Sequence, residues 1–310
     1  MSQSFTAGVH PDPRHAGEAQ DHSLLEARGL GYALFELVRD SAGRPVDVRV
    51  LELSAAFEAQ IGQSRNDVVG RTALESWPTL ETWWLQACAR VVDEGTPTRF
   101  EHQVAATGQW YDVGIFPFEG DRFGVLSEEI STRKRREANA ALLAALKDDF
   151  SQQTTPDDIM QAAGARLGEF LQVAAVDLVD VDDGAAEPFV VNHAWLRGEA
   201  PGAHARQRVR EYLPADVVDA CRAGETVVVR DRDGAFIAVP LHREGRWTHA
   251  LVVCDTGPRE WRPDEVELVE ECARRLIPRV ERARTEVAQH ENELMFHSLF
   301  ASLDEGYLLA

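Results

Sequence analysis

Residues 235–276 read AFIAVPLHREGRWTHALVVCDTGPREWRPDEVELVEECARRL, and this stretch decides the fold of the second half of the chain. Two runs rich in apolar and β-branched residues, 235–245 and 246–255, have the length and composition of β-strands. The first run ends in a glycine that follows charged residues, which is typical of a turn. A long helix is expected to open in the residues that follow. The stretch therefore predicts two neighbouring strands followed by a helix.

The residues before this stretch extend the pattern. In 154–172, Thr155 suits an N-cap, Pro156 suits the first helical position, and apolar residues recur at helical spacing: Ile159, Ala163, Leu167 and Phe170. Two strand-like runs follow, VAAVDLVDVDDG at 173–184 and PFVVNHAWL at 188–196, with turn residues between them. A helical stretch at 212–225 and a strand at 226–231 complete the order: helix, two strands, helix, three strands, long helix.

This order resembles a GAF domain over residues 155–285. The residues that carry the resemblance are GETVVVRD, VPLHREG and the WRPDE stretch at the start of the last helix. The resemblance implies an antiparallel sheet flanked by helices. Some GAF domains bind a bilin through cysteine or bind a cyclic nucleotide. Neither Cys221 nor Cys254 has the Cys-His setting of the bilin-binding domains, and the N-K-x-F-D-E pattern is missing. The side chains to look for near a pocket are His193, Trp195 and His204, with surface loop and core as the alternative.

The last helix, 264–297, carries a heptad pattern that predicts a coiled coil and a homodimer formed through it. Pro278 is expected to kink or break this helix. The seam positions are Val266, Val269, Ala273, Leu276, Val280, Ala283, Val287 and Leu294.

The first half of the chain has a different order of elements. Two strand-like runs, 31–40 and 48–54, flank a Gly- and Pro-containing turn, and short helical pieces follow. The segment LETWWLQACARVVDEG at 80–95 is an amphipathic helix that ends at a glycine. Strand-like runs follow at 98–106, 109–118 and 123–130. Together the two halves predict an α+β fold class with two modules, each with a central antiparallel sheet.

This first module, residues 21–136, resembles a PAS domain in its opening hairpin from FELVRD, its DVVGRT turn and its closing EEISTRKRRE. The resemblance implies a hollow between sheet and helices that can hold a cofactor. Cys88 lacks the setting of the flavin-binding subtype, and the long helix has no histidine to ligate haem. No cofactor is assigned, although an unknown small molecule is possible. The pocket candidates are Phe35, Trp84, Phe100, Trp110 and Tyr111, with plain core as the alternative.

Composition limits the partners. The formal charge of −20 repels phosphate backbones and anionic lipid, so neither nucleic acid nor a membrane is expected to bind the bulk surface. No apolar run reaches the roughly 20 residues that span a bilayer, and no signal peptide is evident, so a cytoplasmic location is expected. Four cysteines lie far apart, and period-two spacing explains the aspartates Asp177, Asp180, Asp182 and Asp183 as the solvent face of a strand and a turn, so no metal is expected.

Residues 22–34, HSLLEARGLGYAL, and 297–309, HSLFASLDEGYLL, share their spacing. A repeated stretch of this kind indicates that a second module of the first type begins at 298–310. The remaining segments are a disordered tail at 1–20 and a helical linker at 132–154. The chain resembles the sensory region of a bacterial sensor histidine kinase, and this resemblance implies a downstream kinase domain and a response regulator as partners.

The sequence carries no catalytic signature of its own: the nucleophile-elbow, P-loop and zinc-protease motifs are all missing. We therefore expect a non-catalytic sensory and signal-relay region. Two alternatives stay open at this point, a phytochrome-type bilin photoreceptor and a dimerisation scaffold without ligand.

Overall fold

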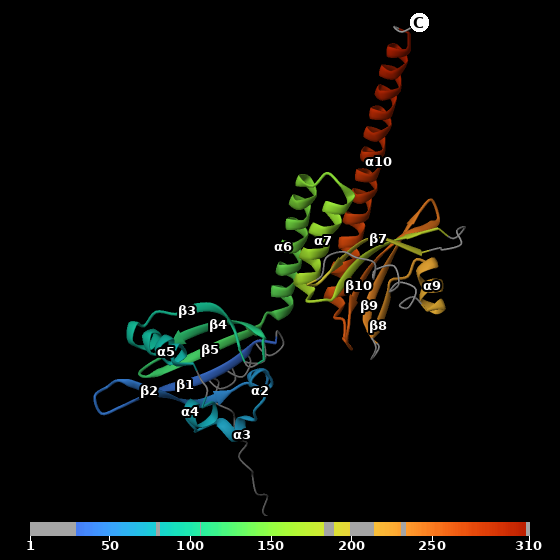
Figure 1. Ribbon diagram of the computed structural model, residues 1–310. Helices are drawn as coiled ribbons and strands as arrows, with labels where there is room; N and C mark the ends of the chain where they lie inside the picture. Colours follow the sequence, from blue (N-terminus) through green and yellow to red (C-terminus); the bar gives the residue numbers. More distant parts are fainter. Residues whose placement is uncertain are drawn as a thin grey trace, which may run out of the picture. The chain divides into compact units, whose positions relative to one another are not determined.

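A computed structural model describes residues 29–78, 81–105, 107–182, 189–198 and 214–230, together with 234–297 and the backbone of 298–307. The chain divides into two compact units, Met1–Lys134 and Arg135–Ala310. Each unit holds one five-stranded antiparallel sheet with helices packed on it, so the expected α+β class is confirmed (Figure 1). The tail at 1–20 lies outside the described residues.

The sheet of the first unit runs in the order β2-β1-β5-β4-β3. Short helices follow the first hairpin, and one longer helix precedes β3. The strands are β1 (Gly31–Arg39), β2 (Pro45–Leu53), β3 (Thr98–Gln103), β4 (Trp110–Pro117) and β5 (Arg122–Glu129), and the helices are α2 (Ala55–Ile61), α3 (Arg65–Val68), α4 (Ala73–Ser76) and α5 (Thr82–Glu94).

One face of this sheet is buried beneath the four helices. Burial alternates along β1, where Ala33, Phe35 and Leu37 point inward, because successive side chains of a strand face opposite sides. The helix α5 turns Cys88 and Val91 into the same core, as its amphipathic pattern requires. The core of the first unit therefore lies between the sheet and the helices.

The chain leaves the first sheet at Glu129 and enters the helix α6 (Ser131–Gln152). Buried Ser131 fixes this exit, since its Oγ accepts a hydrogen bond from the backbone N–H of Trp110 at 2.9 Å, and its own N–H donates to Glu129 Oε1 at 3.0 Å. The Lys134 ammonium lies 5.1 Å from the centre of the Trp110 ring and pairs with Glu101 of β3. The start of α6 is therefore bonded to two strands of the sheet.

The second unit has a sheet in the order β7-β6-β10-β9-β8. Its elements follow the expected order, while the turn at 183–184 lies outside the described residues. The helices are α7 (Pro156–Leu171), α9 (Ala215–Arg222) and α10 (Pro263–Tyr307), and the strands are β6 (Ala175–Val181), β7 (Phe189–Leu196), β8 (Val227–Arg230), β9 (Ala235–Arg243) and β10 (Arg246–Asp255).

Helices cover both faces of the second sheet (Figure 1). The larger core lies between the sheet and α6, α7 and α10, and the smaller one lies under α9. This arrangement corrects the expectation that the β6 aspartates face solvent. Asp177 is 2% exposed on the α9 side, and Asp180 on the other side pairs with Arg284 of α10 at 2.8 Å.

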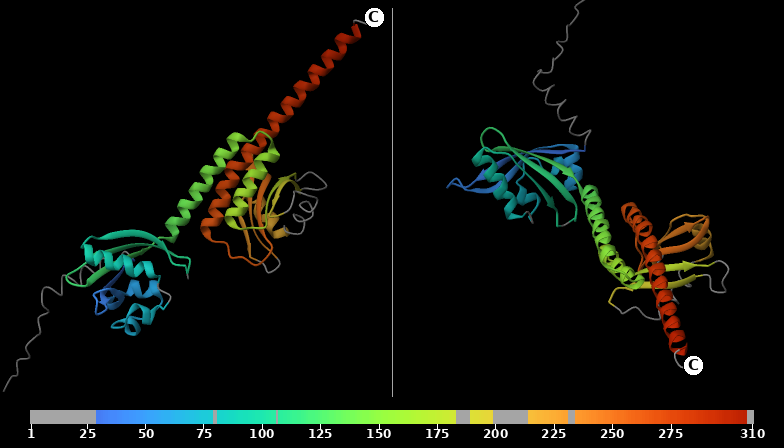
Figure 2. Two further views of the ribbon diagram at one scale, coloured as in Figure 1. Left: turned by 60° about the vertical axis from the view of Figure 1, so that its left-hand side comes forward. Right: turned by 90° about the horizontal axis from the view of Figure 1, so that it is seen from above.

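The helix α10 passes through Pro278 as one unbroken element. Of the eight seam positions, Val269, Ala273, Leu276, Val280 and Ala283 are buried in the core of the second unit, and Val266 packs against it. These side chains pack in the core of their own unit. A heptad pattern alone does not distinguish a helix that packs in a domain core from one that packs on a partner helix. Val287 and Leu294 are exposed, on the part of α10 that continues beyond its sheet (Figure 2).

The helix α10 continues into the stretch 298–310, where a second module of the first type is expected to begin. Gly306 and Tyr307 are helical, and Leu308–Ala310 lie outside the described residues. Among the residues described, no helix combines the length and apolar character needed to cross a bilayer.

Candidate ligand-binding cavity

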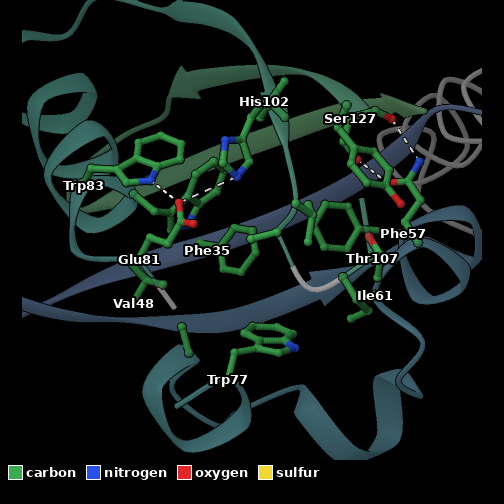
Figure 3. Close-up of a pocket in the computed structure, with 17 residues that line it drawn as sticks. Phe35, Val48, Phe57, Ile61, Trp77, Glu81, Trp83, His102, Thr107 and Ser127 are labelled. Atoms are coloured by element: carbon green, nitrogen blue, oxygen red, sulfur yellow. Dashed lines mark hydrogen bonds and ion pairs between the residues drawn. The ribbon is translucent and has the colours of Figure 1, made fainter. Parts of the chain in front are cut away.

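A cavity of about 650 Å³ lies in the first unit between the sheet and the helices (Figure 3). All five strands or the turns next to them contribute to its lining, as do the helix α2, the start of α4 and the start of α5. The lining residues are Phe35, Val48, Phe57, Gln60, Ile61, Ala73, Trp77, Glu81, Trp83, Trp84, His102, Val104, Ala105, Thr107, Tyr111, Val113 and Ser127. The size is within the range of sites for small organic molecules.

Aromatic rings form a large part of the wall. Phe35 stands near the centre of the sheet and stacks on Phe123 with ring centroids 5.4 Å apart, while Phe57 approaches it edge-on at 6.3 Å. The two tryptophans of the first turn of α5, Trp83 and Trp84, meet each other edge-on at 5.9 Å. Rings in these arrangements are held by their neighbours, so the wall is largely pre-formed.

One end of the cavity is polar and uncharged. Ser127 of β5 donates its hydroxyl hydrogen to Gln60 Oε1, and Gln60 Nε2 donates to the Ser127 carbonyl at 3.2 Å. The pair needs a glycine beside it, because a Cβ at Gly31 would lie 2.5 Å from Gln60 Oε1. Ser127 itself is 6% exposed.

The other end carries a carboxylate. The indole N–H of Trp83 donates to Glu81 Oε2, and His102 Nε2 lies 3.7 Å from the same oxygen. His102 also lies against the Trp83 ring, with centroids 4.9 Å apart. The Glu81 side chain is 46% exposed, so this carboxylate lies at the mouth of the cavity and accepts a hydrogen bond from Trp83 there.

Three of the five first-unit pocket candidates line this cavity: Phe35, Trp84 and Tyr111. The other two do not. Phe100 packs edge-on against Trp83 and Trp84 and lines a neighbouring surface cleft. Trp110 lies under Lys134 at the start of α6.

The polar lining residues and two of the lining tryptophans were not among the candidates predicted from the sequence. His102 lies on β3 and Ser127 on β5, and Trp83 directly precedes the candidate Trp84. The one signal that could have found them is strand alternation: Ser127 shares its face with Phe123 and Val125, two residues apart along β5.

The second-unit candidates lie elsewhere. His193 of β7 pairs through Nδ1 with Asp157 Oδ1 of α7 at 2.6 Å. Trp195 lies across Gly164 and Gly168 of the same helix, where any Cβ would overlap its ring. Both side chains therefore pack between β7 and α7, and His204 lies outside the described residues.

The four cysteines are all buried and none is bonded to another. Burial raises the pKa of the Cys221 thiol to about 11 and that of Cys272 to about 12, and it also raises the pKa of Cys88. These groups are thiols at neutral pH, with little thiolate to attack a ligand. In the described part of the chain, no group of three or more His, Cys, Asp or Glu side chains is placed to hold a metal ion.

The family of the second unit follows from comparison with known proteins. Residues 155–277 match the family model of the GAF domain. The second unit contains a GAF domain. GAF domains are sensory, ligand-binding modules of signalling proteins, and they are non-catalytic. Comparison with curated proteins found no match.

Several solved structures are similar to parts of this chain at low identity. A domain of an HTR-like protein from Haloarcula marismortui is 20% identical, with a TM-score of 0.27 over 33% of this chain and 98% of that one. The GAF domain of a phosphoenolpyruvate-protein phosphotransferase from Coxiella burnetii is 15% identical, with a TM-score of 0.40 over 48% and 96%. The cyanobacteriochrome TePixJ GAF domain is 18% identical, with a TM-score of 0.34 over 44% and 95%.

A buried histidine in the GAF domain is set among charges that tie α10 to the sheet. His249 of β10 is 8% exposed, with Nε2 3.5 Å from Asp180 Oδ1 and Nδ1 3.6 Å from Glu281 Oε1. Arg284 pairs with Asp180 at 2.8 Å, and Arg243 with Glu281 at 3.4 Å. Desolvation lowers the pKa of His249, assisted by the two arginines and opposed by the two carboxylates.

We expect the GAF domain to lose stability as the pH falls from about 7 to about 5. Because the folded pKa of His249 lies below its ordinary value of about 6.5, the unfolded chain binds the proton more readily. This contribution to stability is fully present above pH 6.5 and is lost as the pH falls towards the folded pKa, by at most about 1.4 kcal/mol per pH unit. Urea unfolding at a series of pH values should show a flatter profile for His249→Gln, whereas His290→Gln, at an exposed site on α10, should keep the wild-type slope.

Proposed function

We propose that this chain is the ligand-sensing and relay region of a longer bacterial signalling protein, with a PAS-type receptor domain in the first unit. The observation that carries the proposal is the cavity of about 650 Å³ in that unit, walled by aromatic rings and polar at both ends. A largely apolar, pre-formed hollow with a few polar groups is typical of a small-molecule site. The GAF domain that follows is itself a sensory module, which supports the same role.

The relay would use the two long helices. The helix α6 leaves the first sheet at Ser131 and buries Leu142 and Leu146 in the GAF core, beside residues of α10. Arg279 of α10 donates to the carbonyl oxygens of Phe150 at 3.2 Å and Gln153 at 2.6 Å, at the end of α6. A shift of α6 would therefore be felt by α10 through a shared core and a shared set of hydrogen bonds.

The output lies, in this proposal, in a histidine kinase domain that acts on a response regulator in a cytoplasmic two-component pathway. The support is the resemblance of the module order to sensor kinases and the helix α10, which continues beyond the GAF sheet. A covalently attached bilin finds no support, because all four thiols are buried.

We also propose that the chain forms a homodimer through the projecting part of α10. Val287 and Leu294 stand one heptad apart and are exposed, with Met295 and Phe296 beside them. The partner helix would cover these side chains, because burying a leucine contributes about 1.5–3 kcal/mol.

Leu294→Glu is accordingly expected to weaken the dimer by at least about tenfold in dissociation constant, since it removes an apolar contact and places like charges together. Sedimentation equilibrium of the full chain measures this change. Gln289→Glu adds the same charge at an exposed position off the seam and should leave the dimer intact. Equal effects of the two substitutions would count against this seam.

The ligand-binding proposal is tested by filling the cavity. Ala73 of α4 is 1% exposed and lines the hollow, so Ala73→Phe should occupy part of its volume. A ligand present at about 100 times its dissociation constant stabilises a protein by about 2.7 kcal/mol. In a thermal-unfolding screen of small molecules, the wild type should gain several degrees from at least one compound class and Ala73→Phe should gain none.

Ala59→Phe is the matched control, because Ala59 is exposed on the neighbouring helix α2. It should respond to the same compounds as the wild type. A wild type that responds to no compound, or an Ala73→Phe variant that responds like the wild type, would instead favour a dimerisation scaffold without ligand.

A further inference from the structure

The charges around the cavity limit what it can take. Among its described lining residues, Glu81 is the only carboxylate, and none is a lysine or an arginine. A carboxylate or phosphate group would thus enter without a permanent positive partner, and burying an unpaired charge is costly. His102, the one basic side chain among the described lining residues, lies 3.7 Å from Glu81 Oε2.

The rings beside Glu81 favour positive charge. Trp83 lies at the same end, and the Trp84 ring lies 5.9 Å from it. The face of an aromatic ring carries negative potential. An ammonium group over such a face is attracted by this potential, and the attraction is stronger when the group is desolvated. In Figure 3 Glu81 lies between Trp83 and His102, so a carboxylate and aromatic rings line the same end of the cavity.

The opposite end offers no competing charge. Gln60 and Ser127 bond to each other through both the amide group and the hydroxyl, and both are neutral. Between the two ends the wall is apolar, with Phe57, Ile61 and Val113 among its residues. The electrostatic preference of the cavity is therefore set at the Glu81 end alone.

We propose that the cavity accepts a compact organic cation, an aromatic or alkyl amine or a quaternary ammonium compound, with its charge beside Glu81 and its apolar body along the rings of Phe35 and Trp84. This rests on the proposed ligand-binding function and adds the chemical class of the ligand. Glu81 then selects the charge, and the aromatic wall provides most of the buried contact.

The test compares three compounds of the same shape with the full chain at pH 7.5: phenethylamine, 2-phenylethanol and phenylacetate, which are cationic, neutral and anionic. Isothermal calorimetry should give the tightest binding for phenethylamine, about three- to thirtyfold tighter than for 2-phenylethanol, and the weakest for phenylacetate. This ranking uses the wild type only, so it does not depend on any variant folding.

Glu81→Gln then assigns the preference to one side chain. It should bring phenethylamine and 2-phenylethanol to within about twofold of each other and leave the binding of the neutral compound unchanged. Glu119→Gln removes the same charge from an exposed position outside the lining and should keep the wild-type ranking.

The outcomes separate the two claims. Equal binding of the three compounds, or a preference for phenylacetate, overturns the organic-cation inference while binding in the cavity stands. Unchanged cation preference in Glu81→Gln also overturns it. If none of the three binds the wild type, the inference fails, and the ligand-binding function is decided separately by the comparison of Ala73→Phe with Ala59→Phe.

Discussion

Replacing Gly168 with leucine is expected to lower the free energy of unfolding of the GAF domain by about 3 kcal/mol or more. Gly168 lies in α7 directly beneath the Trp195 ring, and a Cβ there would fall far inside van der Waals distance of three ring atoms. The helix cannot move away easily, because Leu167 and Leu171 of the same helix are buried in the core. Urea unfolding of the full chain, followed by circular dichroism, measures the loss.

The same substitution at Gly257 is the control, since a Cβ there would meet nothing within 4 Å. It should change stability by less than about 0.5 kcal/mol. A double variant, Gly168→Leu with Trp195→Ala, should recover part of the lost stability. The leucine side chain would then occupy space that the Trp195 ring leaves free. If Gly168→Leu were as stable as the wild type, the Trp195 ring could not lie against Gly168.

Arg279→Met is expected to cost about 2–4 kcal/mol, from two hydrogen bonds made by a charged donor. Its guanidinium Nε and Nη2 donate to the carbonyl oxygens of Phe150 and Gln153, which lie at the end of α6 where helix carbonyls lack partners. Methionine keeps much of the side-chain length and apolar stem, so the change isolates the loss of these bonds. Urea unfolding measures the cost.

Arg282→Met is the matched control on the same helix. Arg282 is 77% exposed, and among the described residues its ion pair is with Glu286, one turn on. Its loss should therefore cost less than about 0.5 kcal/mol. Hydrogen exchange should also show faster exchange at the end of α6 in Arg279→Met alone. Equal stability of the two variants would mean that α6 and α10 are not joined at Arg279.

The elements of both sheets were predictable because their signals are local. The alternation of Ala33, Phe35 and Leu37 in β1 and the Thr155-Pro156 start of α7 follow from side-chain direction and capping, which need no knowledge of the rest of the chain. The resemblance of the modules to known families added an antiparallel sheet in each, while the order of the strands within the sheets was not predicted.

The environments of particular faces were not predictable in this way. The apolar stripe of α10 from Val269 to Ala283 has the spacing of a dimer seam, but the GAF core covers it. Asp180 has the spacing of a solvent-facing residue, but Arg284 of α10 reaches it from 104 residues away in the sequence. Periodicity predicts the direction in which a side chain points, but it does not predict which part of the protein packs against that side chain.

The cavity was predictable in part for the same reason. Phe35 and Tyr111 point inward by strand alternation, which the sequence reveals. The meeting of Glu81, Trp83 and His102 depends on how α5 lies against β3, which no local pattern specifies. Gln60 and Ser127 likewise come together across 67 residues.

The central claim is that the first unit binds a small molecule in its cavity. Native mass spectrometry tests it most directly, with the full chain mixed with the small-molecule fraction of a bacterial extract. Our account predicts a bound mass on the wild type and on Ala59→Phe that is absent from Ala73→Phe. A wild type without any bound mass, or the same bound mass on all three proteins, would contradict it.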